Sequence, residues 1–186
     1  MGFKTITLKL PTNFTDEQLQ RKIAKELRIK DFSFQIENKS LDARKKSNIF
    51  WLVKVAVNSP EIKEGKSPVS EILEIPLKKR KEQIVVVGSG PAGFFCALIL
   101  QKAGFKVTLI ERGSEVEKRG KSITTFERTE IFDAQNNYSF GEGGAGTFSD
   151  GKLTSRSKRI SKEKHFILLN YVKAGAPEEI IYMAHP

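Results

Sequence analysis

The N-terminal part of the chain carries a hydrophobic pattern whose period changes along its length. Apolar and polar residues alternate over 5–10 and again over 32–36, which predicts two strands with one buried face each. A mostly apolar run over 49–57 predicts a third strand. Thr15, followed three residues later by Gln18, matches a capping box and predicts a helix that begins at this point. One face of that helix is apolar: Leu19, Ile23, Ala24 and Leu27.

A different pattern follows the stretch 59–82, which contains three prolines with charged residues between them and which we interpret as a linker. Residues 84–87 form a continuous β-branched run, typical of a parallel strand that is buried on both faces. The apolar segment 91–103 predicts a helix, and Gly104 stands where helices commonly end. Residues 106–111 predict the next strand, so this region as a whole predicts one βαβ unit.

The remainder of the chain shows weaker periodicity. A charged stretch covers 112–137, a glycine-rich stretch covers 140–151 and a basic stretch covers 152–164. One or two helices are expected at about 161–174 and 177–184.

Composition and charge narrow the class of protein. Apolar residues make up 39% of the 186 positions, which suffices for a packed core and is unlike a disordered chain. The net charge is +10, and residues 1–82 contribute +7 of it, from 18 Lys and Arg against 11 Asp and Glu. A basic region favours an anionic partner such as RNA. The lysines are scattered rather than gathered in one stripe, however, which favours an ordinary solvated surface.

The single cysteine, Cys96, excludes a disulfide framework and a CxxC metal or redox motif, and no metal site is predicted. Its place inside an apolar helix favours packing in the core. No stretch reaches the ~18 apolar residues of a membrane helix, and the N-terminus lacks the apolar run of a signal peptide. These features favour a reducing, cytoplasmic location without a membrane span.

A glycine-rich motif joins the predicted strand 84–87 to the helix after it. Its sequence is Gly88-Ser89-Gly90-Pro91-Ala92-Gly93. Gly88 permits a tight turn, Gly90 lets the backbone approach a pyrophosphate, and Gly93 lets the helix pack closely on the strand. Pro91 suits the first helical turn, whose N–H groups attract phosphate. Glu111, 18 positions after Gly93, ends the next strand and can accept hydrogen bonds from a ribose. Residues 83–112 therefore predict a site for the ADP half of a dinucleotide.

A second glycine-rich segment carries five glycines over residues 141–151. Such a run can place backbone N–H groups against a flavin ring or phosphates, and hydroxyl donors stand at Thr147 and Ser149. The alternative is a surface loop whose glycines serve only the backbone conformation. The dinucleotide motif upstream favours the binding role.

Two segments carry a resemblance to known proteins. The stretch IVVVGSGPAGFFCALILQKAGFKVTLIERG resembles flavoproteins with two dinucleotide-binding domains, in which GxGPAG followed by an acid and Arg-Gly holds FAD. The stretch GEGGAGTFSDGKL, with SLDARKK and IFW upstream, resembles a bacterial family of FAD-dependent oxidoreductases. These are described as NAD(FAD)-utilizing dehydrogenases, and their substrates are mostly undefined. The resemblance spans residues 41–153 and is strongest over 84–113 and 140–153.

The resemblance implies FAD as cofactor and a set of contacts. The fingerprint 88–93 and Glu111 would hold FAD, with Arg112 and Arg119 on the adenosine side. Toward the flavin end would lie Gly143, Gly144, Thr147 and Lys152. Members of the family are far longer than this chain, so we expect an incomplete domain here.

The predicted fold class is α/β, with a Rossmann-like FAD/NAD(P)-binding domain that is incomplete and is preceded by a small α+β domain of βαββ order. The predicted boundaries are 1–58 for the small domain, 59–82 for the linker and 83–186 for the FAD-binding domain.

The predicted function is that of the FAD-binding portion of a flavin-dependent oxidoreductase of undefined substrate, with NAD(P)H as a candidate electron donor. One alternative is a flavoenzyme or module that acts on RNA through the basic N-terminal region, and another is a non-catalytic remnant. No residue is assigned as catalytic, since His165 and His185 stand alone in the sequence. Lys152 would either stabilise a reduced flavin or remain solvated.

Overall fold

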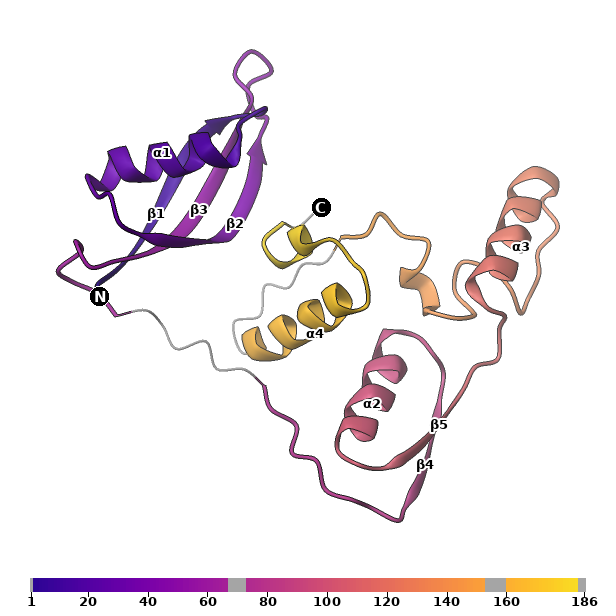
Figure 1. Ribbon diagram of the computed structural model, residues 1–186. Coiled ribbons are helices and arrows are strands. Elements are labelled where there is room, and N and C mark those ends of the chain that lie inside the picture. The colour runs from indigo at the N-terminus through magenta and orange to yellow at the C-terminus, as the bar shows by residue number, and fades with distance from the viewer. Residues whose placement is uncertain (1, 67–72, 153–159, 184–186) are drawn as a thin grey trace. The chain divides into compact units, whose positions relative to one another are not determined.

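The computed structural model describes residues 2–66, 73–152 and 160–183 (Figure 1). Contacts within the chain divide these residues into two compact units. Residues 2–66 and 160–183 belong to the first unit, and residues 73–152 form the second. This division into units does not test the predicted domain boundaries at 1–58, 59–82 and 83–186, which remain predictions.

The first unit contains an antiparallel three-stranded sheet. Its elements are β1 (Gly2–Pro11), α1 (Asp16–Leu27), β2 (Ser33–Asp42) and β3 (Phe50–Ser59), in the order that the hydrophobic pattern predicts. β3 lies at the centre of the sheet, with β1 and β2 as its neighbours. Figure 1 shows α1 lying across one face of the sheet. A core of buried apolar residues joins the two layers: Leu8, Leu10, Leu19, Ile23, Ile29, Val53, Val55 and Val57.

The predicted capping box at the start of α1 is confirmed. The backbone N–H of Gln18 donates to the Thr15 hydroxyl over 3.3 Å, and the Gln18 side chain accepts from the Thr15 N–H over 3.1 Å. Two N–H groups that the helix leaves without partners are thereby satisfied, which fixes where α1 begins.

β2 is longer than its alternating pattern predicts. The alternation ends at Ile36, yet pairing with β3 continues to Asp42 after a register shift between Ile36 and Asn38. Such a bulge adds one residue to one strand and moves the following side chains to the opposite faces. The polar residues that follow Ile36 therefore belong to the strand and not to a loop.

The second unit is built around a parallel βαβ unit. Its elements are β4 (Gln83–Val87), α2 (Pro91–Lys102) and β5 (Lys106–Ile110), and β4 pairs with β5 in parallel. Farther along the chain follow α3 (Val116–Thr129) and a short 3₁₀ turn, η1 (Gly144–Gly146). The remaining elements, α4 (Ser161–Lys173) and the 3₁₀ turn η2 (Glu178–Ile181), belong to the first unit.

The expectation that β4 is buried on both faces is wrong for the described residues. Ile84 and Val86 are half-buried, whereas Val85 and Val87 are 55% and 81% exposed. In the described residues, β4 and β5 form a two-stranded sheet with α2 on one face only. Alternate residues of β4 therefore stay open to solvent on the other face. Cys96 is also exposed, which corrects its predicted place in the core.

The C-terminal end of α2 is held by the last part of the predicted linker. The N–H groups of Lys78 and Arg80 donate to the carbonyls of Ala103 and Gly104 over 3.2 and 3.3 Å. Gly104 has φ +96°, and a β carbon there would lie 2.1 Å from the Lys78 carbonyl oxygen. The predicted helix end at Gly104 is therefore confirmed, and a basic segment lies against the negative end of the helix dipole.

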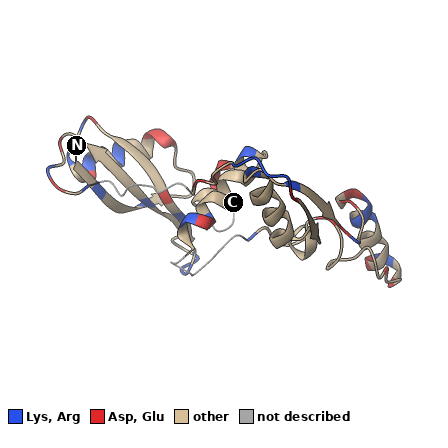
Figure 2. Ribbon diagram, turned by 90° about the horizontal axis from the view of Figure 1, so that it is seen from below, with Lys and Arg blue, Asp and Glu red and all other residues tan. Residues whose placement is uncertain are grey.

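Charge is mixed over both units. Figure 2 shows basic and acidic segments interspersed along the chain. Within the described ranges, no helix combines the length and the apolar character needed to cross a bilayer. The same residues contain no cluster of three or more His, Cys, Asp or Glu side chains that would hold a metal ion.

The core of the first unit is tested by Ile23→Ala. Ile23 lies on α1 with none of its surface exposed, so truncation should lower the free energy of unfolding by about 2–5 kcal/mol. Trp51 on β3 is the only tryptophan of the chain, and its fluorescence during urea unfolding reports on this unit. Leu41→Ala serves as control, because Leu41 is 49% exposed. An equal loss in both variants would contradict this assignment of the core.

Candidate dinucleotide-binding site

The glycine-rich motif lies at the junction of β4 and α2. Gly88 has φ +96°, a left-handed conformation that favours glycine, and the turn there leads out of the strand. A β carbon on Gly93 would lie 1.9 Å from the Gly88 carbonyl oxygen. Position 93 therefore cannot carry a side chain while α2 keeps its place on β4. This contact is the close helix–strand packing that the sequence predicts for Gly93.

The first turn of α2 presents backbone N–H groups without protein acceptors. Gly90 is the residue before the helix and offers no side-chain cap, and Pro91 is the first helical residue. The first helical bond of the turn joins the Phe94 N–H to the Gly90 carbonyl over 2.9 Å. Among the described residues, none accepts from the N–H groups of Ala92 or Gly93. Free N–H groups and the helix dipole make this end attractive to an anion.

Glu111 links the ends of the two parallel strands. Its Oε2 accepts from the Ser89 N–H over 2.7 Å and from the Ser89 hydroxyl over 3.0 Å, and its Oε1 accepts from the Gly113 N–H over 2.9 Å. The hydrogen bond from the Ser89 N–H, followed by that from Gly113, lowers the pKa of Glu111 from 4.5 to about 2. The carboxylate is thus charged at neutral pH, and its spare lone pairs can accept from a ribose hydroxyl.

The second glycine-rich segment reaches the first. The Gly143 N–H donates to the Ser89 carbonyl over 3.1 Å. Gly144 has φ +64°, and a β carbon there would lie 3.0 Å from the Gly90 Cα. The structure therefore brings Gly143 and Gly144 to the fingerprint loop, as a wall beside the start of α2.

Arg119 of α3 is fully buried and holds this second segment. Its Nε donates to a backbone carbonyl over 3.1 Å, and its two terminal nitrogens donate to three further carbonyls and one hydroxyl. The acceptors belong to Asn137, Tyr138, Glu142, Gly144 and Thr147. Burial lowers the pKa of the guanidinium from its usual value. All five N–H groups of Arg119 thus have acceptors within the chain. The predicted contact of Arg119 with adenosine remains a prediction.

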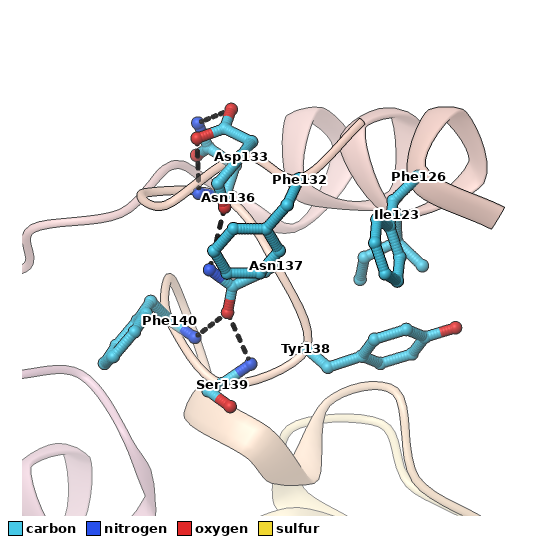
Figure 3. Close-up of a pocket in the computed structure, with 9 residues that line it drawn as sticks. All are labelled: Ile123, Phe126, Phe132, Asp133, Asn136, Asn137, Tyr138, Ser139 and Phe140. Atoms are coloured by element: carbon cyan, nitrogen blue, oxygen red, sulfur yellow. Dashed lines mark hydrogen bonds between the residues drawn. The ribbon is translucent and has the colours of Figure 1, made fainter. Parts of the chain in front are cut away.

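Residues 131–140 form a hydrogen-bonded loop beside α3. The Asn137 side chain accepts from the N–H groups of Ser139 and Phe140 and donates to the Asp133 carbonyl (Figure 3). The Asp133 carboxylate in turn accepts from Gln135 and Asn136. The loop and α3 enclose a pocket of about 140 Å³, lined by aromatic rings and amide side chains. These residues are Ile123, Phe126, Phe132, Asp133, Asn136, Asn137, Tyr138, Ser139 and Phe140.

Of the remaining predicted site residues, Thr147 belongs to the second glycine-rich segment, and Arg112 and Lys152 are exposed. The Arg112 guanidinium lies 4.0 Å from the centre of the Phe140 ring, and its side chain is exposed. Thr147 donates from its hydroxyl to the Glu142 carbonyl over 3.0 Å and so belongs to the second segment. Lys152 is exposed, and its N–H donates to the Asp150 carboxylate. His165 lies on α4 in the first unit, and His185 lies outside the described residues.

Sequence reasoning missed the element that carries Arg119. The stretch 112–137 is rich in charged residues and is not predicted to be helical, yet it contains the fourteen-residue helix α3. Its signal is the spacing of Val116, Ile123 and Phe126, which approximates one helical face.

The low pKa of Glu111 predicts how the second unit responds to acid. Because the pKa falls from 4.5 to about 2 on folding, the stabilisation is complete above pH 4.5 and is lost as the pH falls toward 2. We expect the carboxyl carbon of Glu111 to titrate near pH 2 in an NMR series. Ser89→Ala removes the hydroxyl donor but keeps the N–H donor, so it should raise that midpoint only in part. A midpoint near 4.5 in the unsubstituted chain would mean that these hydrogen bonds do not form.

Comparison with known proteins agrees with the site. Residues 81–134 match the family model of an FAD binding domain, and residues 3–58 match a domain of unknown function, DUF8436. An uncharacterized protein of Clostridium beijerinckii is 41% identical over 179 residues, which cover 88% of this chain and 33% of that protein. The chain thus spans about a third of the length of this relative. The match over 81–134 includes the fingerprint and Glu111, and it identifies FAD as the cofactor.

Proposed function

We propose that this chain is the FAD-binding part of a flavin-dependent oxidoreductase, with the cofactor pyrophosphate at the start of α2. The observation that carries the proposal is the fingerprint 88–93, which opens α2 with unpaired N–H groups inside the matched FAD binding domain. The proposal includes oxidoreductase activity on an undefined substrate, with NAD(P)H as the electron donor. The type of enzyme proposed is a bacterial NAD(FAD)-utilizing dehydrogenase.

The local geometry fits a dinucleotide. Apart from Gly88 and its two chain neighbours, no atom of the described residues lies within 4 Å of the place where a β carbon of Gly88 would stand, so the backbone there is open to a ligand. At Gly90 the nearest atom to such a carbon is the Gly144 Cα, at 3.9 Å. A pyrophosphate can approach the N–H groups of Ala92 and Gly93 only because neither Gly88 nor Gly90 carries a side chain.

Each residue of the site has a role in this proposal. Ala92 and Gly93 would donate backbone hydrogen bonds to the pyrophosphate, and Glu111 would accept from the adenosine ribose. The negative charge of Glu111 disfavours a 2′-phosphate at this position, which favours FAD over NADP. Arg112, stacked on Phe140, would place positive charge near the adenosine side.

The second glycine-rich segment would lie along the cofactor toward its flavin end. FAD, when bound, supplies the two-electron chemistry by accepting hydride from a donor. The contribution of this chain is to hold and orient the cofactor with Gly143, Gly144 and Thr147. Lys152 would place a positive charge where a reduced flavin carries negative charge. The exposed Cys96 has no cysteine partner in the sequence, so a dithiol mechanism is not part of the proposal.

FAD titration of the purified chain tests this proposal. We expect FAD fluorescence to be quenched with a saturating dependence on protein concentration. Gly90→Glu should abolish the quenching, because a side chain and a negative charge would enter the pyrophosphate position. Gln101→Glu is the matched control, since it adds the same charge at the other, exposed end of α2.

The control should bind FAD within about threefold of the unsubstituted chain, as expected for an exposed surface change. Equal binding by Gly90→Glu and the unsubstituted chain would contradict the proposed site. Binding of NAD or ADP without any binding of FAD would contradict the flavin assignment and leave only a nucleotide site.

A further inference from the structure

We infer that Arg119 is a positioning residue of the FAD site, which holds the segment 137–147 against the fingerprint loop without touching the cofactor itself. This inference rests on the proposed function. It adds a residue whose influence on FAD passes through the second glycine-rich segment.

The hydrogen bonds of Arg119 leave no donor for a ligand. A guanidinium has five N–H groups, and in this structure they serve five acceptor oxygens of the chain itself. The contact to the Gly144 carbonyl, at 2.7 Å, is well formed, and the Phe148 ring lies 5.0 Å from the guanidinium carbon. With none of its surface exposed, Arg119 cannot reach a cofactor in this arrangement.

The positive charge of Arg119 has no carboxylate in contact among the described residues. The charges of Glu111 and Glu142 both act on Arg119, yet the Glu111 carboxylate accepts from the Ser89 and Gly113 N–H groups and the Glu142 carboxylate accepts from the Val116 N–H. Only the backbone carbonyl of Glu142 accepts from Arg119. Backbone carbonyls therefore compensate the buried charge. A buried charge needs such partners to persist, so the carbonyls and the guanidinium hold each other in place.

The same contacts connect α3 to the start of α2. A β carbon on Gly141 would lie 2.3 Å from the Arg119 Cδ, so the segment passes directly over the arginine side chain. Arg119 then binds the Gly144 carbonyl, and Gly144 lies against Gly90. On its other side Arg119 binds the carbonyls of Asn137 and Tyr138, two residues that line the pocket in Figure 3. Its loss would free both ends of this segment.

Two substitutions at position 119 separate the contributions of charge and shape. Arg119→Lys keeps the charge but offers three donors from one atom and cannot reproduce the planar fork. Arg119→Met keeps a long apolar stem and removes every donor. The matched control is Arg128→Met, on the same helix and exposed. All three variants are made in the full 186-residue chain.

The first measurement is amide hydrogen exchange without cofactor. In the unsubstituted chain the N–H groups of Gly143 and Gly144 are bonded to the carbonyls of Ser89 and Gly141. Arg119→Met should accelerate their exchange by more than about tenfold, while the amides of β4 and β5 keep their protection. Arg119→Lys should show a smaller effect, and Arg128→Met none.

The second measurement is the affinity for FAD, together with the absorption spectrum of the bound flavin. This spectrum reports on the surroundings of the flavin and does not depend on the overall stability of the chain. Arg119→Met should weaken FAD binding by at least about tenfold. The spectrum of its bound flavin should shift toward that of free FAD. Arg119→Lys should restore part of both properties, and Arg128→Met should equal the unsubstituted chain.

Two results would overturn the inference. Unchanged affinity and spectrum in Arg119→Met would show that FAD does not depend on this residue. Loss of protection in β4 and β5 together with 143–144, in both position-119 variants, would show a general structural role. A chain that binds no FAD before substitution contradicts the proposed function and the cofactor half of this inference. The exchange measurement, made without cofactor, then decides separately whether Arg119 holds the segment.

Discussion

The close approach of two backbones at Gly88 and Gly93 is the constraint on which the second unit depends. The Gly88 carbonyl oxygen occupies the place that a β carbon of Gly93 would need, at 1.9 Å. Any side chain at position 93 would push α2 away from β4. This contact sets the direction in which α2 begins, and it therefore sets where the unpaired N–H groups of the first turn point. The proposed pyrophosphate position follows from it.

A second constraint acts at longer range along the chain. The fingerprint is local, since its strand, turn and helix are consecutive. The wall beside it comes from Gly143 and Gly144, which are held by a hydrogen bond to Ser89 and by the guanidinium of Arg119. The site thus combines a turn that forms from its own residues with a loop that a buried arginine on α3 keeps in place.

The local features could be predicted from the sequence because their causes are local. The capping box at Thr15 and the helix end at Gly104 each depend on a few neighbouring residues. The pattern of glycines from Gly88 to Gly93 likewise predicts the turn and the helix start. The assignment of FAD came from the resemblance to flavoproteins that these residues carry, and it agrees with the match over 81–134.

The features that escaped prediction depend on distant partners. The bulge after Ile36 breaks the alternation that identifies a strand, so the second half of β2 resembles a loop in sequence. The resemblance implies a contact of Arg119 with adenosine, but the sequence gives no sign of its burial, because its acceptors are 18 or more positions away along the chain. The predicted burial of Val85 and Val87 requires helices on both faces of the sheet. In the described residues a helix covers one face only.

The central claim is that FAD binds at the start of α2, and amide NMR during an FAD titration tests it most directly. The account predicts that the N–H resonances of Ala92 and Gly93 shift most and saturate together with the flavin fluorescence. Resonances of α1 in the first unit should stay unchanged. Shifts confined to other elements, with those of Ala92 and Gly93 unmoved at saturation, would contradict the account.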